Sequence, residues 1–304
     1  MSLLSDILRR TRSDLVERRS HLPLSELQRR AKDMPPPKSL KDALSKRFSI
    51  IGEIKRRSPS AGDMNSRNVA DALDVYNDSP IITAISVLTD EPFFGGSLER
   101  LWQVRNATSK PILRKDFILD EYQVWEARAF GADAILLMGA VHEEYPTRLK
   151  DLYELAKSLG LQALVEIGMS EAGPQQQAAI VPRDADIWGI NSRQFHISRF
   201  NLRMRASKLL GQDFTTSSNR HRQLRGLTPD GKIVVAESGI HKPQEIDALV
   251  HLGYHAALIG TAFLKGPRRV ADVVAAFAER IANLTQVAAD IDHSDLAWQR
   301  TARQ

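Results

Sequence analysis

The chain has 304 residues, a length that fits one large α/β domain or two domains of ordinary size. Hydrophobic residues make up 42% of the chain and charged residues 26%, which is typical of a soluble protein with a normal core. The formal net charge is +5, which favours an anionic partner but says nothing about the fold. Cysteine is absent, which excludes disulfides, thiolate catalysis and cysteine-based metal sites.

The sequence of residues 1–46 predicts a helical extension that precedes the main domain. Leu4, Ile7, Leu8 and Leu15 recur at helical spacing, and the prolines of "MPPPKS" (34–39) interrupt the pattern. This start lacks the apolar segment of a secretory signal, and no apolar run approaches the roughly 18 residues that span a bilayer. We therefore expect a cytoplasmic protein with no membrane partner.

Eight short apolar runs recur along the middle of the chain. They are residues 48–54, 81–88, 111–115, 133–138, 162–167, 186–191, 232–238 and 255–260. Helical patterns that end in glycine lie between them, at 119–131, 144–160 and 242–253. Continuously apolar runs are typical of parallel strands covered by helices. The pattern predicts an α/β fold, a (β/α)8 TIM barrel over residues 47–285. A doubly wound sheet is the alternative, but the glycine-rich turn after its first strand is missing.

Two segments fall outside the repeat. Residues 286–304 read as a polar C-terminal tail. Residues 192–231 form a long connection rich in arginine that contains "FTTSSNRHRQLRG", a polar tract that looks flexible. It lacks the interleaved aromatic residues of a nucleic-acid surface, so we expect a solvated loop and no nucleic-acid partner. We also expect residues 196–228 to be an excursion that can be shortened without loss of activity.

Polar residues follow most of the predicted strands at their carboxyl ends. These residues are Glu53, Lys55, Lys115, Glu166, Asn191, Glu237 and Ser238. In a barrel of this kind the strands deliver their carboxyl ends to one mouth, where chemistry takes place. A solvated strand end explains any one of them alone, but Lys and Glu are rarely buried unless they are paired. Together they predict a site in which neighbouring charges supply an acid and a base near neutral pH.

The seventh and eighth strand ends are small and polar, "ESGI" (237–240) and "IGTA" (259–262). Backbone N–H groups can approach an anion there, and a phosphate often binds at these loops of a barrel. Ser58, in the loop after the first strand, can add a hydroxyl. Glycines that only form tight turns are the alternative. The histidines show no metal-binding spacing, so no metal is expected. No cofactor is expected either.

Seven blocks of sequence carry a family resemblance. They are "EIKRRSPSAG" (53–62), "ISVLTDEPFFGGSLERL" (85–101), "PILRKDFILDEYQVWEARAFGADAILLM" (111–138), "LVEI" (164–167), "GINSR" (189–193), "VAESGI" (235–240) and "LIGTAFLK" (258–265). With these blocks in this order, the chain resembles the indole-3-glycerol phosphate synthase family over roughly residues 1–283. The resemblance also implies that the N-terminal extension packs on the barrel.

The resemblance implies a role for each matching residue. Lys55 would face the substrate carboxylate and Glu53 would orient Lys55. Lys115 would be the general acid and Glu166 the general base, and we expect these two to face each other across the barrel mouth. The supporting polar residues would be Asn191, Glu237 and Ser238. The phosphate would be held by Ser58, Gly239, Gly260 and Thr261. The aromatic ring of the substrate would be bordered by Pro59, Phe94, Phe117 and Arg193.

The reaction implied by the resemblance is the decarboxylating ring closure and dehydration of 1-(2-carboxyphenylamino)-1-deoxyribulose 5-phosphate, a step of tryptophan biosynthesis. A barrel like phosphoribosylanthranilate isomerase is one rival, but it would need a Cys–Asp pair and the chain has no Cys. A non-catalytic phosphate- or nucleic-acid-binding barrel is the other, and it would be expected to have lost Lys55, Lys115 or Glu166. The expected partner is a phosphorylated small molecule. A monomer is expected, with a homodimer as the alternative.

Overall fold

The computed structural model describes residues 3–169, 173–194 and 214–284. Its centre is a closed barrel of parallel strands in the order β1-β10-β9-β8-β7-β6-β5-β4. The strands are β1 (Ser49–Ile54), β4 (Ile82–Leu88), β5 (Ile112–Lys115), β6 (Ala134–Met138), β7 (Gln162–Met169), β8 (Ile187–Gln194), β9 (Ile233–Glu237) and β10 (Ala256–Ile259). Each strand falls on one of the eight apolar runs, so the predicted (β/α)8 barrel is confirmed.

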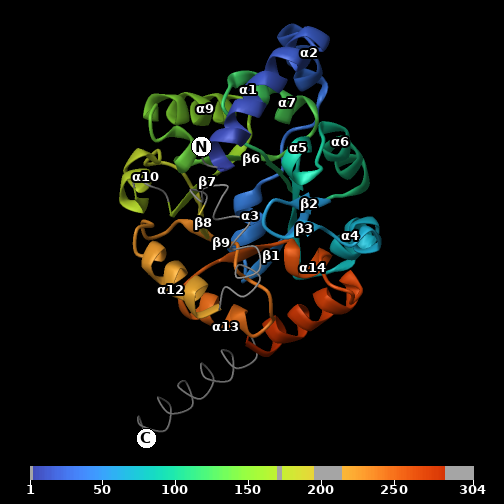
Figure 1. The fold of residues 1–304 in the computed structure, drawn as a ribbon, viewed down its shortest axis with the longest axis vertical. Coiled ribbons are helices and arrows are strands. Elements are labelled where there is room, and N and C mark those ends of the chain that lie inside the picture. Colours follow the sequence, from blue (N-terminus) through green and yellow to red (C-terminus); the bar gives the residue numbers. More distant parts are fainter. Residues whose placement is uncertain (1–2, 170–172, 195–213, 285–304) are drawn as a thin grey trace, which may run out of the picture.

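Helices surround the barrel (Figure 1). The longer ones are α4 (Ser66–Asp78), α6 (Leu98–Ala107), α7 (Glu121–Ala129), α9 (Pro146–Ser158), α10 (Pro174–Ile180), α12 (Phe214–Arg225) and α13 (Glu245–His251), and residues 270–284 are also helical. Short helices follow three of the strands: α5 (Glu91–Phe94) follows β4, α8 (Gly139–His142) follows β6 and α14 (Thr261–Leu264) follows β10. The glycines predicted to end three helices, Gly131, Gly160 and Gly253, all have positive φ, as a helix stop requires. No helix in the described ranges is both long enough and apolar enough to span a bilayer.

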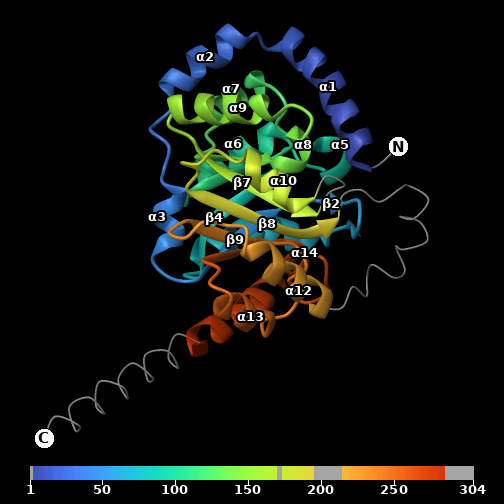
Figure 2. The same ribbon diagram turned by 90° about the vertical axis from the view of Figure 1, so that its left-hand side faces the viewer.

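The N-terminal extension packs on one side of the barrel and also covers the amino ends of the strands. Helices α1 (Leu3–His21) and α2 (Leu24–Asp33) arch over α7 and α9 in Figure 2. Tyr122 of α7 donates its hydroxyl hydrogen bond to the backbone oxygens of Arg18 at 3.1 Å and Leu22 at 2.7 Å. The apolar contact between the extension and α7 consists of Leu15, Leu27, Ala31, Tyr122 and Ala129. The predicted helical extension is therefore confirmed.

Helix α3 (Leu40–Ser45) packs one face against the interior of the barrel. Leu40 and Leu44 are fully buried in the same apolar cluster as Ile51 and Val235 of the strands. The backbone N–H of Lys41 donates to the side chain of Gln162, the first residue of β7, at 2.9 Å. The helix thus plugs the amino ends of the strands and leaves the carboxyl ends open for a site.

The polar tract at residues 214–225 is helical, which the sequence analysis did not predict. Helix α12 (Phe214–Arg225) buries His221 and Leu224 completely, three positions apart. Among residues 219–225, the part of this helix whose burial is described, two buried positions are too few for a periodic pattern, and one of them is a histidine. The expectation of a solvated excursion is therefore wrong for α12, and the effect of shortening this segment on activity stays a prediction. Residues 195–213 and the predicted tail lie outside the described residues.

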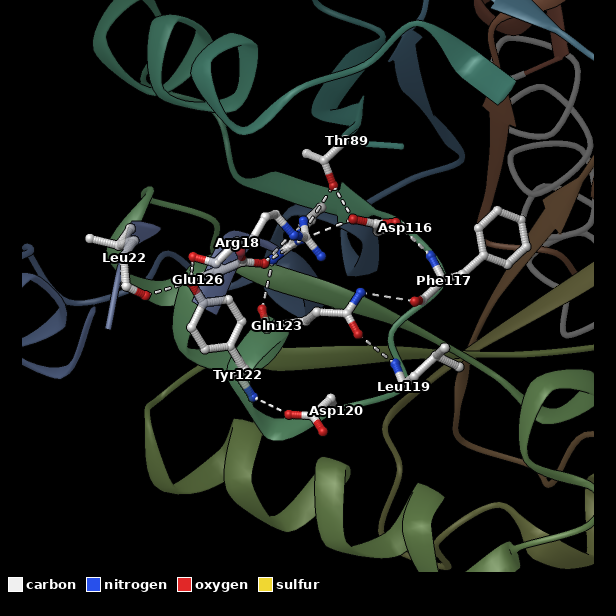
Figure 3. A network of polar contacts seen from close by, with 11 residues as sticks. Arg18, Leu22, Thr89, Asp116, Phe117, Leu119, Asp120, Tyr122, Gln123 and Glu126 are labelled. Atoms are coloured by element: carbon white, nitrogen blue, oxygen red, sulfur yellow. Dashed lines mark hydrogen bonds and ion pairs between the residues drawn. The ribbon is translucent and has the colours of Figure 1, made fainter. Parts of the chain in front are cut away.

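A buried arginine holds the end of β5 against α7. Arg114 is fully buried and donates from Nε to Thr89 Oγ1 at 2.9 Å and from Nη1 to the backbone oxygen of Gln123 at 2.7 Å. Its Nη2 donates to Asp116 at 2.8 Å and to Glu126 at 3.0 Å. Figure 3 shows the network around Thr89, Asp116 and Glu126. Because buried charges need partners, this network fixes the chain on both sides of Lys115.

We expect Arg114→Met to lower the free energy of unfolding by about 3–5 kcal/mol, because the buried carboxylate of Asp116 would lose its cation and Glu126 would keep only the more distant Arg18. Urea unfolding followed by circular dichroism measures this change. The control is Lys157→Met, which removes a pair between the exposed side chains of Lys157 and Asp184 and should leave the unfolding midpoint nearly unchanged. Equal midpoints for the two variants would contradict a structural role for the network.

Candidate active site

Four charged residues form one layer inside the mouth of the barrel. Glu53, Lys115, Glu166 and Glu237 come from β1, β5, β7 and β9, which are every second strand in the barrel order. In barrels of this type, alternate strands supply the side chains of one interior layer. The three glutamates are at most 4% exposed. Charged side chains therefore fill an interior layer of the barrel, at a depth where buried apolar side chains are usual.

Lys115 is the cation that joins this layer. Its Nζ lies 2.7 Å from Glu237 Oε2 and 3.4 Å from Glu166 Oε2. Lys115 and Glu166 therefore contact each other directly and do not face each other across an open mouth as expected. The reason is that β5 and β7 are separated by one strand only, which brings their inward side chains together. Glu237 Oε1 is buried with no hydrogen-bond partner among the described residues.

Burial and the short distances between charges in the layer shift the pKa values of Lys115 and Glu237. Burial lowers the pKa of Lys115, but Glu237 and Glu166 outweigh burial and hold this pKa above its ordinary value. Burial raises the pKa of Glu237, Lys115 opposes the rise, and the nearby Glu166 carboxylate adds to it. Lys115 thus stays charged at neutral pH, while Glu237 binds a proton more readily than an ordinary glutamate.

A second ion pair lies beside the layer. Lys55 follows β1 and its Nζ bonds the carboxylate of Glu53, with both side chains buried. Burial raises the pKa of Glu53, but Lys55 and Lys115 outweigh burial and lower this pKa overall. Burial lowers the pKa of Lys55, Glu53 opposes the fall, and Arg193 adds to it. An additional anion near Lys55 and Arg193 would therefore relieve the repulsion between these cations.

Two glycines make room for the carboxylates of the layer. A Cβ at Gly260, directly after β10, would lie 2.3 Å from Glu53 Oε1. A Cβ at Gly189 of β8 would lie 2.2 Å from Glu237 Oε1. Both distances are far shorter than any ordinary contact. Gly260 was predicted to bind a phosphate. Its position shows that a residue without a side chain is also needed there to leave room for Glu53, which the sequence did not reveal.

The mouth of the barrel is a cavity that most of the predicted site residues line. Every predicted residue except Ser58 and Pro59 contributes to its wall. Ser58 is 3% exposed, and its hydroxyl accepts a hydrogen bond from the backbone N–H of Ala61 at 3.1 Å, within its own turn. The wall also includes Leu88, Asp116, Leu136, Met138, Ile240, His241, Leu258 and Ile259. Leu88 and Met138 end β4 and β6, and the sequence analysis missed them because it searched strand ends for polar residues.

Phe94 and Phe117 give the cavity an aromatic side. Their ring centroids are 6.1 Å apart and both rings are buried. Asp90 caps α5 by accepting the backbone N–H groups of Phe93 and Phe94 at 2.8 and 3.1 Å. Asp116 accepts the backbone N–H of Phe117 at 2.8 Å. Carboxylates therefore fix the backbone beneath each ring.

The opposite side of the cavity is polar and made largely of backbone. Ser238 and Gly239 follow β9 with φ of 66° and 73°, and Thr261 begins α14. The side-chain oxygen of Asn191 accepts the backbone N–H of Arg193 at 3.0 Å. The cavity is thus aromatic at one end and presents small residues with tightly turned backbone at the other.

Two buried histidines hold the backbone next to the cavity. His142 of α8 lies with Nε2 3.1 Å from the backbone oxygen of Ile118, and His221 of α12 lies with Nε2 3.2 Å from that of Ser238. A carbonyl only accepts, so Nε2 carries the proton in both. Burial lowers the pKa of each histidine from 6.5 to about 4. Both are therefore neutral at neutral pH.

These histidines predict a loss of stability in weak acid. Between pH 6.5 and about 4 the unfolded chain binds their protons and the folded chain does not, so stability falls as pH is lowered through this window. The shift corresponds to at most about 3 kcal/mol per histidine. Urea unfolding at pH 7 and pH 5 measures the change. Between these two pH values, the free energy of unfolding should fall less for the double variant His142→Gln/His221→Gln than for the unsubstituted chain. The exposed His251→Gln should match the unsubstituted chain, and an unchanged pH dependence in the double variant would contradict the account.

We expect Gly260→Ala to cost about 1–3 kcal/mol of stability and most of the activity, because the new Cβ must displace Glu53 from Lys55. Thermal unfolding and turnover measure the two effects. Gly266→Ala is the matched control, since a Cβ there meets no atom within 4 Å. If both variants behave alike, the space beside Glu53 is not needed.

The chain matches a family of known proteins over most of its length. The family model of indole-3-glycerol phosphate synthase matches residues 4–275. An indole-3-glycerol phosphate synthase of Kineococcus radiotolerans is 39% identical over 285 residues, which cover 91% of this chain and 96% of that protein. One of Thermoanaerobacter pseudethanolicus is 37% identical and covers 86% of this chain and 92% of its own length.

Solved structures agree on the fold alone. A 3-hexulose-6-phosphate synthase from Salmonella typhimurium has a TM-score of 0.55 at 12% identity, covering 78% of this chain and 99% of that one. An N-(5'-phosphoribosyl)anthranilate isomerase from Pyrococcus furiosus has a TM-score of 0.50 at 12% identity, with the same coverage. Such low identity carries no information on chemistry. The family match spans nearly the whole chain, and the protein belongs to the indole-3-glycerol phosphate synthase family.

Proposed function

We propose that the protein converts 1-(2-carboxyphenylamino)-1-deoxyribulose 5-phosphate to indole-3-glycerol phosphate, carbon dioxide and water. The observation that carries the proposal is the Lys115 ammonium, held between Glu166 and Glu237 inside a cavity that also contains the Glu53–Lys55 pair. This arrangement offers a proton donor, a proton acceptor and a cation for a carboxylate within one enclosed space. Membership of the family supports the same reaction.

The two sides of the cavity suit the two ends of the proposed substrate. The aromatic ring would pack against Phe94 and Phe117, and its carboxylate would face Lys55. The phosphate would bind at the opposite end, against Gly239 and Thr261. Binding of the two ends positions the reacting carbons, so binding energy far from the chemistry lowers the barrier to ring closure.

Ring closure forms one carbon–carbon bond and breaks another. The ring carbon that bears the carboxylate attacks the ketone carbon, and the ketone oxygen takes a proton from Lys115. Carbon dioxide then leaves, and its bonding electrons restore the aromatic ring. The raised pKa of Lys115 keeps the donor charged until this step, and the glutamates beside it stabilise the charge before the proton moves.

Dehydration completes the indole. The hydroxyl formed in the first step leaves as water with a proton from Lys115. Glu166 accepts the proton from the neighbouring carbon, so that a carbon–carbon double bond forms. Lys115 needs a second proton between the two steps. Glu237 lies 2.7 Å from Nζ and has a raised pKa, so it is placed to return that proton.

One experiment tests the activity directly. The purified protein is mixed with the carboxyphenylamino substrate without any added cofactor, and the indole fluorescence of the product is followed. We expect a rise that is stoichiometric with the substrate consumed. A folded protein that produces no indole would overturn the proposal and favour a phosphate-binding barrel without this activity.

We expect Lys115→Met and Glu166→Gln each to lower kcat by roughly 10²–10⁴-fold, because each removes a proton transfer made in the transition state. KM should change much less. The two losses should not multiply in the double variant, since the residues contact each other and act together. Glu154→Gln, at a half-exposed glutamate, is the control and should turn over normally. Near-normal turnover by Glu166→Gln would remove Glu166 as the base.

A further inference from the structure

The turn after β9 has a strained backbone next to the cavity. Ser238, with φ of 66°, is the one non-glycine residue in the described part of the chain with a positive φ. Residues with a Cβ avoid this conformation, and it persists where surrounding contacts hold it. Ser238 and Gly239 both line the cavity. Whatever holds Ser238 in place therefore also shapes this wall of the site.

The contacts that hold Ser238 come from β8 and α12. The backbone oxygen of Ser238 accepts from Ser192 Oγ at 3.1 Å and from His221 Nε2 at 3.2 Å. Arg220, the residue before His221, donates to the backbone oxygen of Ser192 at 3.0 Å. Adjacent residues of α12 thus bond the backbone at the ends of two neighbouring strands.

His221 is itself fixed in orientation. It is fully buried, and its ring meets the ring of Tyr254 edge-on, with centroids 5.4 Å apart and an interplanar angle of 86°. The Tyr254 hydroxyl donates to the backbone oxygen of His221 at 2.9 Å and lies 3.3 Å from its Nδ1. With Nδ1 facing the hydroxyl, Nε2 points at Ser238. His221 does not line the cavity, so any effect on a ligand must pass through the turn.

We propose that His221 is a positioning residue that holds the Ser238–Gly239 turn in the shape that binds the phosphate monoester of the substrate. The proposal rests on the proposed function, because it assigns that phosphate to this end of the cavity. It gives α12 a role in the site, although the sequence of this segment reads as a solvated loop. Loss of the N–H donor would let the Ser238 backbone relax from its left-handed conformation and weaken phosphate binding.

The chain contains a matched control at the other end of the cavity. His142 is also buried, and its Nε2 bonds the backbone oxygen of Ile118, next to Phe117. A histidine that only supports the fold should affect both ends alike. If each histidine acts on its own turn, substitution of His142 should leave phosphate binding unchanged while substitution of His221 weakens it.

The experiment measures inorganic phosphate binding by calorimetry and substrate turnover for four variants of the full chain. They are His221→Leu, His221→Gln, Tyr254→Phe and His142→Leu. We expect His221→Leu to weaken phosphate binding and to raise KM by about five- to tenfold, as for the loss of one hydrogen bond, with kcat changed much less. His221→Gln keeps an N–H donor at the Nε2 position and should restore most of the affinity. His142→Leu should bind phosphate as the unsubstituted chain does.

Tyr254→Phe keeps the ring and removes the hydroxyl that orients His221, so it should weaken phosphate binding in the same direction by a smaller factor. It decides the question if His221→Leu does not fold. The inference would be overturned if a folded His221→Leu kept its phosphate affinity and KM within twofold of the unsubstituted chain. If His221→Leu does not fold, the same result for Tyr254→Phe would overturn it. Equal losses of phosphate affinity in His142→Leu and His221→Leu would also overturn it. Absence of turnover by the unsubstituted chain would instead count against the proposed function, because phosphate binding is measured without turnover.

Discussion

The contact of the Lys115 ammonium with Glu166 and Glu237 is the interaction on which the site depends. An ammonium inside a barrel is stable only if carboxylates lie against it, and carboxylates there are stable only beside a cation. Because alternate strands fill one interior layer, β5, β7 and β9 bring the three side chains together without any loop. The reacting groups therefore lie on the strands of the barrel and not on its loops.

This arrangement places demands on residues that carry no charge and on residues outside the cavity. Gly189 and Gly260 leave the space that the carboxylates occupy. Behind Lys115, the fully buried Arg114 bonds Asp116 and Glu126, and Arg18 of α1 lies 3.4 Å from the same Glu126. The N-terminal extension is thus joined by a chain of charged contacts to the strand that carries Lys115. The extension therefore packs on α7 and also helps to fix the strand that carries Lys115.

The sequence predicted the barrel and most of the cavity wall because both depend on local patterns. Each strand overlaps one of the apolar runs, and Glu53, Lys115, Glu166 and Glu237 are polar residues at or near the ends of such runs. Contacts between distant residues left no local signal. His221 meets Ser238 across 17 positions of sequence, inside a tract whose composition is typical of a loop. Gly260 and Glu53 are far apart in the sequence and adjacent only because β10 pairs with β1. In the sequence alone, a glycine that makes room for Glu53 cannot be distinguished from a glycine that binds phosphate.

The two buried histidines also fit the electrostatics of the cavity. The cavity wall carries the cations Lys55, Lys115 and Arg193 and the carboxylates Glu53, Asp116, Glu166 and Glu237. Asp116 is also paired with Arg114, which lies outside the wall. A lysine or arginine that bonded the same backbone oxygens would add a buried charge and shift every pKa in the layer. A neutral imidazole donates one N–H and adds none. The turns can therefore be fixed without disturbing the proton affinities of Lys115 and Glu237, on which the proposed proton transfers depend.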